Sequence, residues 1–180
     1  QLVIIPFNYR MLDTATFNIT KGFDNSWQNY LQSLSYDGAT QLGCINFSAV
    51  KSDIIFLFSD GRNTYGNNLF SRSPTQVFCI HSAANTDSRN LEKIVGQSGG
   101  RYINLSTITF SEAIQYTQRA ENLLIDIQSA SGRTVIDQEL PVSRTDEVLI
   151  TGVLGNANDK LIFRYGNCKN TMATEEFVVY

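Results

Sequence analysis

The chain has 180 residues, of which 42% are hydrophobic and 17% are charged, and its formal net charge at pH 7 is −3. This composition argues for a folded chain that buries one core, or a core with a small appendage, and against a disordered chain. The acidic balance offers no basic surface to nucleic acid, and no apolar run approaches the roughly 18 residues of a membrane helix. We therefore expect neither nucleic acid as a partner nor a membrane-spanning segment.

Two strands and two helices are predicted in the first fifty residues. Residues 2–7 are apolar and strand-like, and residues 15–20 alternate as a half-exposed edge strand does. Ser26 can cap the first helix, which ends at the loop of residues 36–40. The apolar residues of the first helix have helical spacing and are Trp27, Tyr30, Leu31 and Leu34. Those expected to face inward in the second helix are Leu42, Ile45 and Ala49.

The stretch that organises the chain follows these helices. Residues 54–58 are five apolar side chains without a polar break, which is typical of a strand buried on both faces of a parallel sheet. We therefore expect helices to cover every side chain of this run, Phe56 and Phe58 included. The run stops at Ser59-Asp60-Gly61. Asp60 is thus predicted at the carboxyl end of a strand, where open α/β sheets bind their ligands.

Two more strands and two more helices complete the first part of the chain. Residues 76–80 and residues 101–105 each predict a strand. Between them, Asn85 or Thr86 can cap a helix that ends at Gly99-Gly100, a common C-terminal signal. A further helix has apolar spacing at Phe110, Ala113 and Ile114. Because strands alternate with helices, residues 1–119 are expected to form an α/β domain with a mainly parallel, doubly wound sheet flanked by helices.

The pattern changes after residue 120, where no helical period is present. Short strands separated by Gly and Asn turns are predicted at residues 123–127, 133–136, 148–151, 160–164 and 177–180. Short strands at such regular spacing indicate antiparallel pairing. We therefore expect residues 120–180 to be a small all-β domain, built as an antiparallel sandwich or half of one.

Asp60 and Thr40 are candidate metal ligands. A carboxylate at a strand end and a hydroxyl ahead of a helix are both hard oxygen donors, which suit Mg²⁺, Mn²⁺ or Ca²⁺ completed by water. The alternative is that Asp60 forms a turn and Thr40 caps a helix. His81, the only histidine, and the three cysteines have no partner at a spacing typical of catalysis or of zinc. No nucleophile elbow, phosphate loop or HExxH occurs either, so we expect no enzyme.

Two runs of residues carry a resemblance to von Willebrand factor type A domains. The first is Asp37-Gly38-Ala39-Thr40 followed by residues 54–61, and the second spans residues 77–103, with Gly99-Gly100-Arg101 before its last strand. The resemblance covers roughly residues 1–119, and it implies that Thr40 and Asp60 belong to a metal-ion-dependent adhesion site. The β-rich tail is similar to a bacterial branch of the family with an amino-terminal vault/inter-alpha-trypsin (VIT) domain.

One family motif is missing from the sequence. In the family, DxSxS follows the first strand and supplies further metal ligands, but it occurs nowhere in this chain. Residues 2–8 match the second family strand, so we expect the chain to be a piece of a longer protein, with the upstream part of the same polypeptide as a partner. A divalent cation should then bind this piece weakly or not at all. Either residues 2–7 or a strand from another copy should pair with residues 54–59.

Two functions remain open on the sequence. The leading hypothesis is a noncatalytic binding or adhesion module that engages a protein ligand through a divalent ion, to which the ligand supplies a carboxylate. The alternative is a structural or assembly domain that has a vestigial metal site and uses the β-rich part as its interaction surface. The family resemblance favours the cell surface or envelope as the location.

Overall fold

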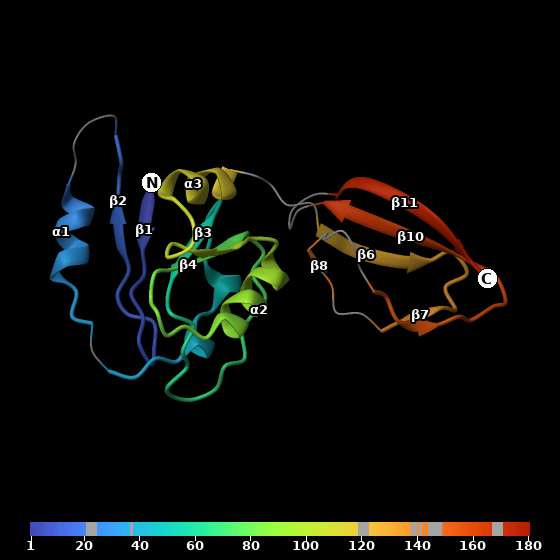
Figure 1. The fold of residues 1–180 in the computed structure, drawn as a ribbon, viewed down its shortest axis with the longest axis horizontal. Helices are drawn as coiled ribbons and strands as arrows, with labels where there is room; N and C mark the ends of the chain where they lie inside the picture. The colour runs from blue at the N-terminus through green and yellow to red at the C-terminus, as the bar shows by residue number, and fades with distance from the viewer. Residues whose placement is uncertain are drawn as a thin grey trace. The chain divides into compact units, whose positions relative to one another are not determined.

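The computed structural model describes residues 1–20, 25–36, 38–118, 123–137, 140, 142–143, 149–166 and 171–180. Within these residues the fold is mixed α/β, with a three-stranded parallel sheet and separate antiparallel sheets (Figure 1). No helix among them is long and apolar enough to cross a membrane. The helices are α1 (Ser26–Ser33), the 3₁₀ helices η1 (Leu42–Cys44) and η2 (Phe47–Ala49), α2 (Ser88–Ser98) and α3 (Phe110–Gln118). The strands are β1 (Leu2–Ile4), β2 (Ala15–Phe17), β3 (Ile55–Phe58), β4 (Val77–His81), β5 (Tyr102–Asn104), β6 (Leu123–Ser129), β7 (Val135–Ile136), β8 (Val142–Ser143), β9 (Gly152–Val153), β10 (Asp159–Gly166) and β11 (Thr171–Val179).

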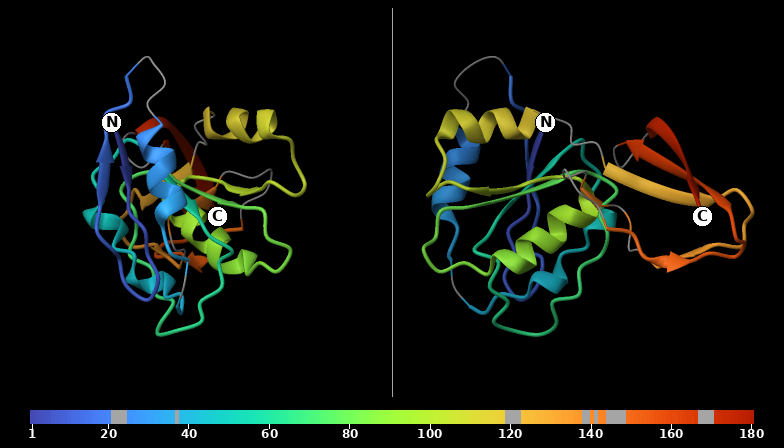
Figure 2. Two further views of the ribbon diagram at one scale, coloured as in Figure 1. Left: turned by 90° about the vertical axis from the view of Figure 1, so that its left-hand side faces the viewer. Right: turned by 45° about the vertical axis from the view of Figure 1, so that its right-hand side comes forward.

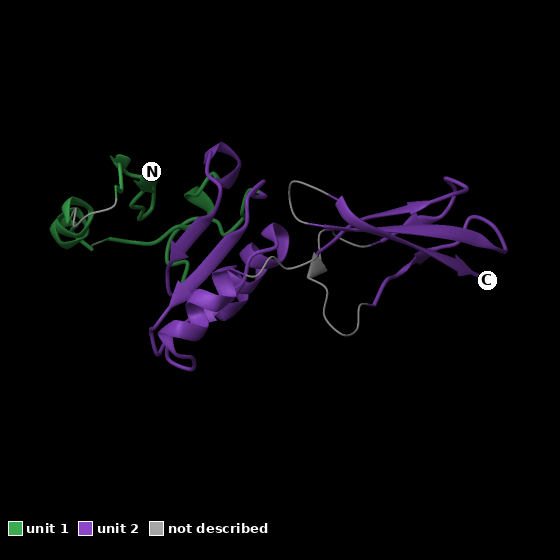
Figure 3. Ribbon diagram, turned by 90° about the horizontal axis from the view of Figure 1, so that it is seen from above, with its two compact units in different colours: residues 1–46, 62–71 green, residues 47–61, 72–180 purple. Residues whose placement is uncertain are grey.

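The chain divides into two compact units, residues 1–46 with 62–71 and residues 47–61 with 72–180 (Figure 3). In the first unit, β1 and β2 pair antiparallel, with Leu2 opposite Phe17. The ring of Phe17 lies 5.7 Å from the ring of Tyr30 on α1, so an aromatic contact joins the helix to the strand pair. The two predicted strands are therefore present but shorter than expected, and β1 has β2 as its partner.

β4 is the centre of the parallel sheet, whose strand order is β3–β4–β5. All five residues of this strand are buried. Phe78 and Ile80 pack with Ile103 of β5 and Ala113 of α3 on one face. On the other face α2 contacts β4, so the two helices lie on opposite sides of the sheet (Figure 2). For these three strands, the expected parallel sheet flanked by helices is present.

The junction after α2 explains why two glycines follow the helix. Gly99 has a left-handed φ of +70°, and its N–H donates to the carbonyl of Val95 to close the last turn. Gly100 passes so close to β4 that a Cβ would lie 1.8 Å from the carbonyl oxygen of Val77. The buried hydroxyl of Ser98 accepts the N–H of Val77 at 3.1 Å and that of Gly100 at 3.3 Å. The predicted helix end is thus confirmed, and the second glycine serves the contact with the sheet.

Thr109 and Glu112 begin α3 as a reciprocal cap. The N–H of Thr109 donates to the carboxylate of Glu112 at 2.8 Å, and the N–H of Glu112 donates to Oγ1 of Thr109 at 3.3 Å. Such a capping box satisfies N–H groups that have no partner within the helix. The hydrogen bonds from Thr109 favour the anion and lower the pKa of the Glu112 carboxyl.

The structure corrects two expectations about the region before β4. β3 lies at an edge of the parallel sheet, because β4 is its only partner among the described strands. Leu57 is 6% exposed, whereas Phe56 is 44% and Phe58 is 69% exposed. The expectation that helices cover both faces of residues 54–58 is therefore wrong. The helix expected after Thr40 is replaced by the short 3₁₀ helices η1 and η2.

From Leu123 onward the strands pair antiparallel, as predicted. One sheet has the order β11–β10–β6–β8, and β7 pairs separately with β9. The core of this region consists of Leu124 of β6 and of Leu161, Phe163 and Tyr165 of β10. Five partly buried residues pack against it, namely Ile127, Ile136, Leu140, Ile150 and Val179. The two expected domain limits, residues 119 and 120, lie outside the described residues.

Asp159 is a buried carboxylate that holds the turn between β6 and β7. It is 6% exposed, and it accepts hydrogen bonds from Oγ of Ser129 at 2.6 Å, from Oγ of Ser131 at 2.8 Å and from the hydroxyl of Thr134. These hydrogen bonds hold the pKa of the Asp159 carboxyl far below its usual range, and the bond from Ser129 has the largest effect, followed by that from Thr134. Because the folded-state pKa is lowered, the stabilisation is present above the ordinary carboxyl pKa and is lost as the pH falls through the lowered value.

Two phenylalanines in register predict different costs of truncation. Phe56 of β3 pairs with Phe78 of β4, their rings lie 5.9 Å apart, and Phe78 is only 1% exposed. Phe78→Ala should lower the free energy of unfolding by about 3–5 kcal/mol, because it empties a core position, and Phe56→Ala by about 1 kcal/mol. Urea denaturation of dilute protein measures both values. Equal costs would show that Phe56 is covered in solution.

Candidate functional site at the carboxyl end of the parallel sheet

The turn after β3 has a backbone conformation that favours glycine. Gly61 has a φ of +75°, and a Cβ at this position would lie 2.3 Å from the carbonyl oxygen of Asp87. The N–H of Gly61 donates to Oγ of Ser59 at 3.1 Å. Asp60 stands between these two residues, two positions after the last residue of β3. The candidate carboxylate is therefore carried by a tight turn at the carboxyl end of the strand.

The amino-terminal end of α2 holds this turn in place. The N–H of Asp87 donates to the carbonyl of Asp60 at 2.9 Å, and the side-chain amide of Asn90 donates to the carbonyl of Gly61 at 2.8 Å. Asn90 also donates to the carboxylate of Asp87 at 3.2 Å. The bonds to the turn fix its main chain, and the side chain of Asp60 is half-buried at the rim of the sheet. Sequence reasoning missed Asn90, because its contact joins residues 29 positions apart.

In the first unit, a loop at residues 63–65 holds Thr40. The N–H of Thr40 donates to Oγ1 of Thr64 at 2.8 Å, and the carbonyl of Thr40 accepts the N–H of Thr64 at 2.9 Å and that of Tyr65 at 3.1 Å. The next short helix, η1, has Gln41 as its N-cap residue. The alternative in which Thr40 caps a helix is therefore wrong. Asp37, from the same predicted loop, lies outside the described residues.

Asp60 belongs to the second unit and Thr40 to the first. Their oxygen atoms are of the type that Mg²⁺, Mn²⁺ and Ca²⁺ prefer, but these ions take about six or more oxygen ligands. Across the described parts of the chain, no group of three or more His, Cys, Asp or Glu residues could hold a metal ion. The two predicted ligands therefore have suitable chemistry but are too few to hold a divalent ion without water or an added ligand.

His81, at the end of β4, is buried and hydrogen-bonded through both ring nitrogens. It is 7% exposed, its Nε2 lies 2.5 Å from the hydroxyl of Tyr102, and its Nδ1 lies 2.9 Å from Oγ1 of Thr86. Thr86 donates its own proton to the carbonyl of Ala83 at 2.9 Å, so it accepts from Nδ1–H. Nε2 is then the acceptor for Tyr102. Both nitrogens are occupied, and the partners of this histidine are hydroxyl groups rather than the backbone.

Burial disfavours ionisation of the two cysteines in the described part of the chain. Cys79 on β4 is fully buried, which raises the pKa of its thiol to about 12. Burial also raises the pKa of Cys44. Because the thiolate is the reactive form, a thiol that stays protonated at neutral pH is a poor nucleophile. Cys79 therefore acts as a small apolar core residue, while Cys168 lies outside the described residues.

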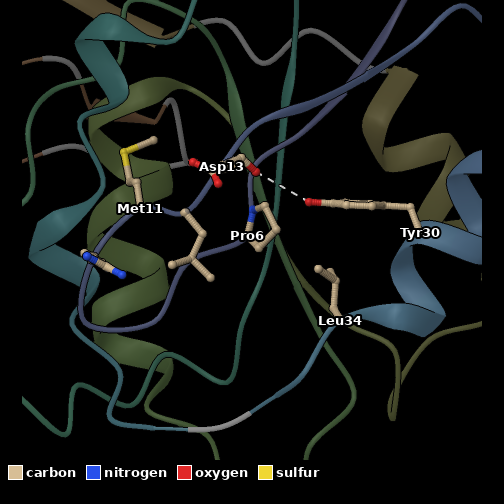
Figure 4. A pocket seen from close by; sticks show the side chains of 7 residues that line it. Pro6, Met11, Asp13, Tyr30 and Leu34 are labelled. Atoms are coloured by element: carbon tan, nitrogen blue, oxygen red, sulfur yellow. Dashed lines mark hydrogen bonds between the residues drawn. The ribbon is translucent and has the colours of Figure 1, made fainter.

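A hollow of about 400 Å³ opens in the first unit beside α1 (Figure 4). Its lining combines apolar side chains with one cation and one carboxylate, and consists of Pro6, Arg10, Met11, Leu12, Asp13, Tyr30 and Leu34. The hydroxyl of Tyr30 donates across the hollow to the carbonyl of Asp13 at 3.4 Å. This hollow is not apparent from the sequence. It forms where the loop after β1 meets α1, which begins further along the chain.

Comparison with known proteins adds no functional information. No model of a protein family matches the chain, and no curated protein matches it.

Gly61→Ala should destabilise the chain by about 1–3 kcal/mol, because the new side chain meets the Asp87 carbonyl in a left-handed backbone. Gly132→Ala is a matched control. Gly132 has a similar φ of +67°, but no atom lies within 4 Å of the position of its Cβ, so its cost is conformational only. Urea denaturation of both variants isolates the cost of the close approach. Equal losses would show that the turn can move away from α2.

Tyr102 should contribute to the free energy of unfolding at neutral pH, and this contribution should persist into the alkaline range. Burial, and secondarily the charge of Glu92, raises the pKa of Tyr102 above the usual 10.0. A raised folded-state pKa contributes stability below pH 10, and this stability is lost as the pH rises through the raised value. At pH 8, Tyr102→Phe should cost about 1–3 kcal/mol, since Nε2 of His81 loses its donor.

Urea denaturation at several pH values tests this dependence. The cost of Tyr102→Phe should shrink as the pH rises above 10, because the wild-type protein loses the tyrosine contribution there. Tyr180→Phe is the control, since Tyr180 is 88% exposed. A cost that is constant from pH 8 to high pH would contradict the assignment of Tyr102 as the hydrogen-bond donor.

Proposed function

We propose that this chain is a noncatalytic module that binds a protein ligand at the carboxyl end of its parallel sheet, in the manner of the von Willebrand A-like domains that it resembles. The observation that carries the proposal is the position of Asp60. Its main-chain carbonyl is held by Asp87, so an acidic side chain is presented from a tight turn at the edge where open α/β sheets bind ligands. A rigid polar rim of this kind suits recognition, because little ordering entropy is lost when a ligand binds.

In this proposal a divalent cation strengthens the contact. Asp60 would supply one hard oxygen atom to Mg²⁺, Mn²⁺ or Ca²⁺, and an acidic side chain of the ligand would supply another. The bound ion would attract a carboxylate of the ligand. The resemblance that suggests this role also favours the cell surface or envelope as the location.

A structural or assembly role is the second candidate, and the exposure of β11 favours it. This strand lies at the edge of the antiparallel sheet. Three of its apolar side chains are about half exposed, at Met172 (56%), Phe177 (46%) and Val178 (54%). Exposed apolar side chains on an edge strand are a common basis for association between chains. In this alternative the metal site is vestigial and the β-rich part carries the interaction.

Calorimetric titration with Mg²⁺, Mn²⁺ and Ca²⁺ separates the two candidates. The binding module should take up one of these ions weakly or not at all, because Asp60 supplies few of the ligands that the ion needs, and Asp60→Ala should abolish any binding. Asp53→Ala is the matched control, because it removes a carboxylate just before the opposite end of the same strand.

The other outcomes are equally informative. An ion that binds wild type and Asp60→Ala with equal affinity would favour the assembly role. Tight binding that Asp60→Ala abolishes would contradict the conclusion that the two predicted ligands are too few.

A further inference from the structure

The outer edge of β3 carries backbone groups that no described residue pairs. The N–H groups of Ile55 and Ser59 donate to the carbonyls of Gln76 and Ile80, at 3.0 and 3.2 Å, so these two residues direct their backbone groups toward β4. Backbone groups alternate in direction along a strand. Phe56 and Phe58 therefore direct their N–H and C=O groups to the other side, where no described residue bonds to them. This edge can accept an added strand.

The same edge carries exposed apolar side chains. Phe56 is 44% exposed and Phe58 is 69% exposed. Natural edge strands are usually protected by lysine, proline or a bulge. Residues 54–58 contain no charged residue and no proline. The strand therefore carries neither a charge nor a proline that would oppose pairing at this edge.

We propose that β3 pairs antiparallel with β3 of a second copy of this chain, which joins the two parallel sheets into one. A two-fold axis beside Leu57 places Phe56 opposite Phe58 of the partner subunit. Each such pair then exchanges two backbone hydrogen bonds and brings two aromatic rings together across the strands. A contact of this kind is self-complementary, as a two-fold interface must be.

The charges at the ends of β3 permit this register. With Leu57 at the axis, Asp60 lies opposite Ile54 of the partner subunit, and Asp53 lies opposite Gly61 of the partner subunit. Like charges directly opposite each other destabilise a strand pair, and the register places none there. The strand itself is uncharged between residues 54 and 58, so the edge shows no preference for an acidic or a basic partner.

The exposed area suits a weak dimer. A whole phenylalanine side chain presents on the order of 200 Å². The exposed parts of Phe56 and Phe58 then offer roughly 200–250 Å² from each copy, before the strand backbone is counted. Two copies would bury less than the roughly 1,000 Å² at which specific, stable interfaces begin. We therefore expect a reversible dimer that dissociates on dilution.

Sedimentation velocity over a wide range of protein concentration, in the presence of EDTA, tests the proposal. The wild-type chain should shift from monomer to dimer, and Phe58→Lys should raise the dissociation constant at least tenfold by placing a charge on the apolar edge. Val153→Lys is the matched control, because Val153 is also 69% exposed but lies on β9. Its dissociation constant should equal that of wild type.

A second variant tests the backbone bonds separately. Phe58→Pro removes an N–H that points to the open edge, while the N–H of Ser59 still donates to β4, and proline is tolerated where the N–H of an edge strand faces outward. It too should weaken the dimer at least tenfold. A chain that stays monomeric at every concentration, or a dimer that neither Phe58 variant weakens, would overturn the proposal. Because EDTA is present, these outcomes do not depend on the metal-binding proposal.

Discussion

The second unit depends on burying β4 on both of its faces and along both of its edges. Backbone N–H and C=O groups of a buried strand must be paired, so β4 needs a strand on each side as well as a helix on each face. β3 and β5 supply the strands, and α2 and α3 supply the helices. The contact of Gly100 with Val77 and the hydroxyl of Ser98 set α2 against β4. The turn at Gly61 follows from this packing, because Asp87 and Asn90 at the start of α2 hold it.

Elements that depend on neighbouring residues were predictable from the sequence. The end of α2 is signalled by Gly99-Gly100, whereas its N-cap residue is Asp87 and not the expected Asn85 or Thr86. Which strand is central is not a local property. Residues 54–58 and 77–80 are similar apolar runs, and the number of partner strands is what makes one an edge strand and the other central. The sequence analysis therefore predicted a buried Phe56 where the structure has a half-exposed one.

The candidate site shows the same limit. The place of Asp60 follows from the end of an apolar run, which is a local signal. The contact of Thr64 with Thr40 joins residues 24 positions apart, and the bond from Tyr102 to His81 joins residues 21 positions apart. Such contacts arise only when loops and strands meet in the folded chain. The sequence therefore indicated which residue types carry the chemistry. It did not indicate the partners that fix the main chain of Thr40 or that hydrogen-bond to the ring nitrogens of His81.

The carboxyl rim and the open edge of β3 would meet their partners in different directions. The rim lies beyond the end of the strand and presents the charge of Asp60, so binding there weakens as salt screens the charge. The edge lies along the side of the strand and offers backbone groups and apolar rings, which salt screens little. A ligand and a second copy therefore need not compete. Only Ser59 separates Phe58 from Asp60, but the turn that carries the acid is held by Asp87 and Asn90 at the start of α2 and does not depend on pairing at the edge.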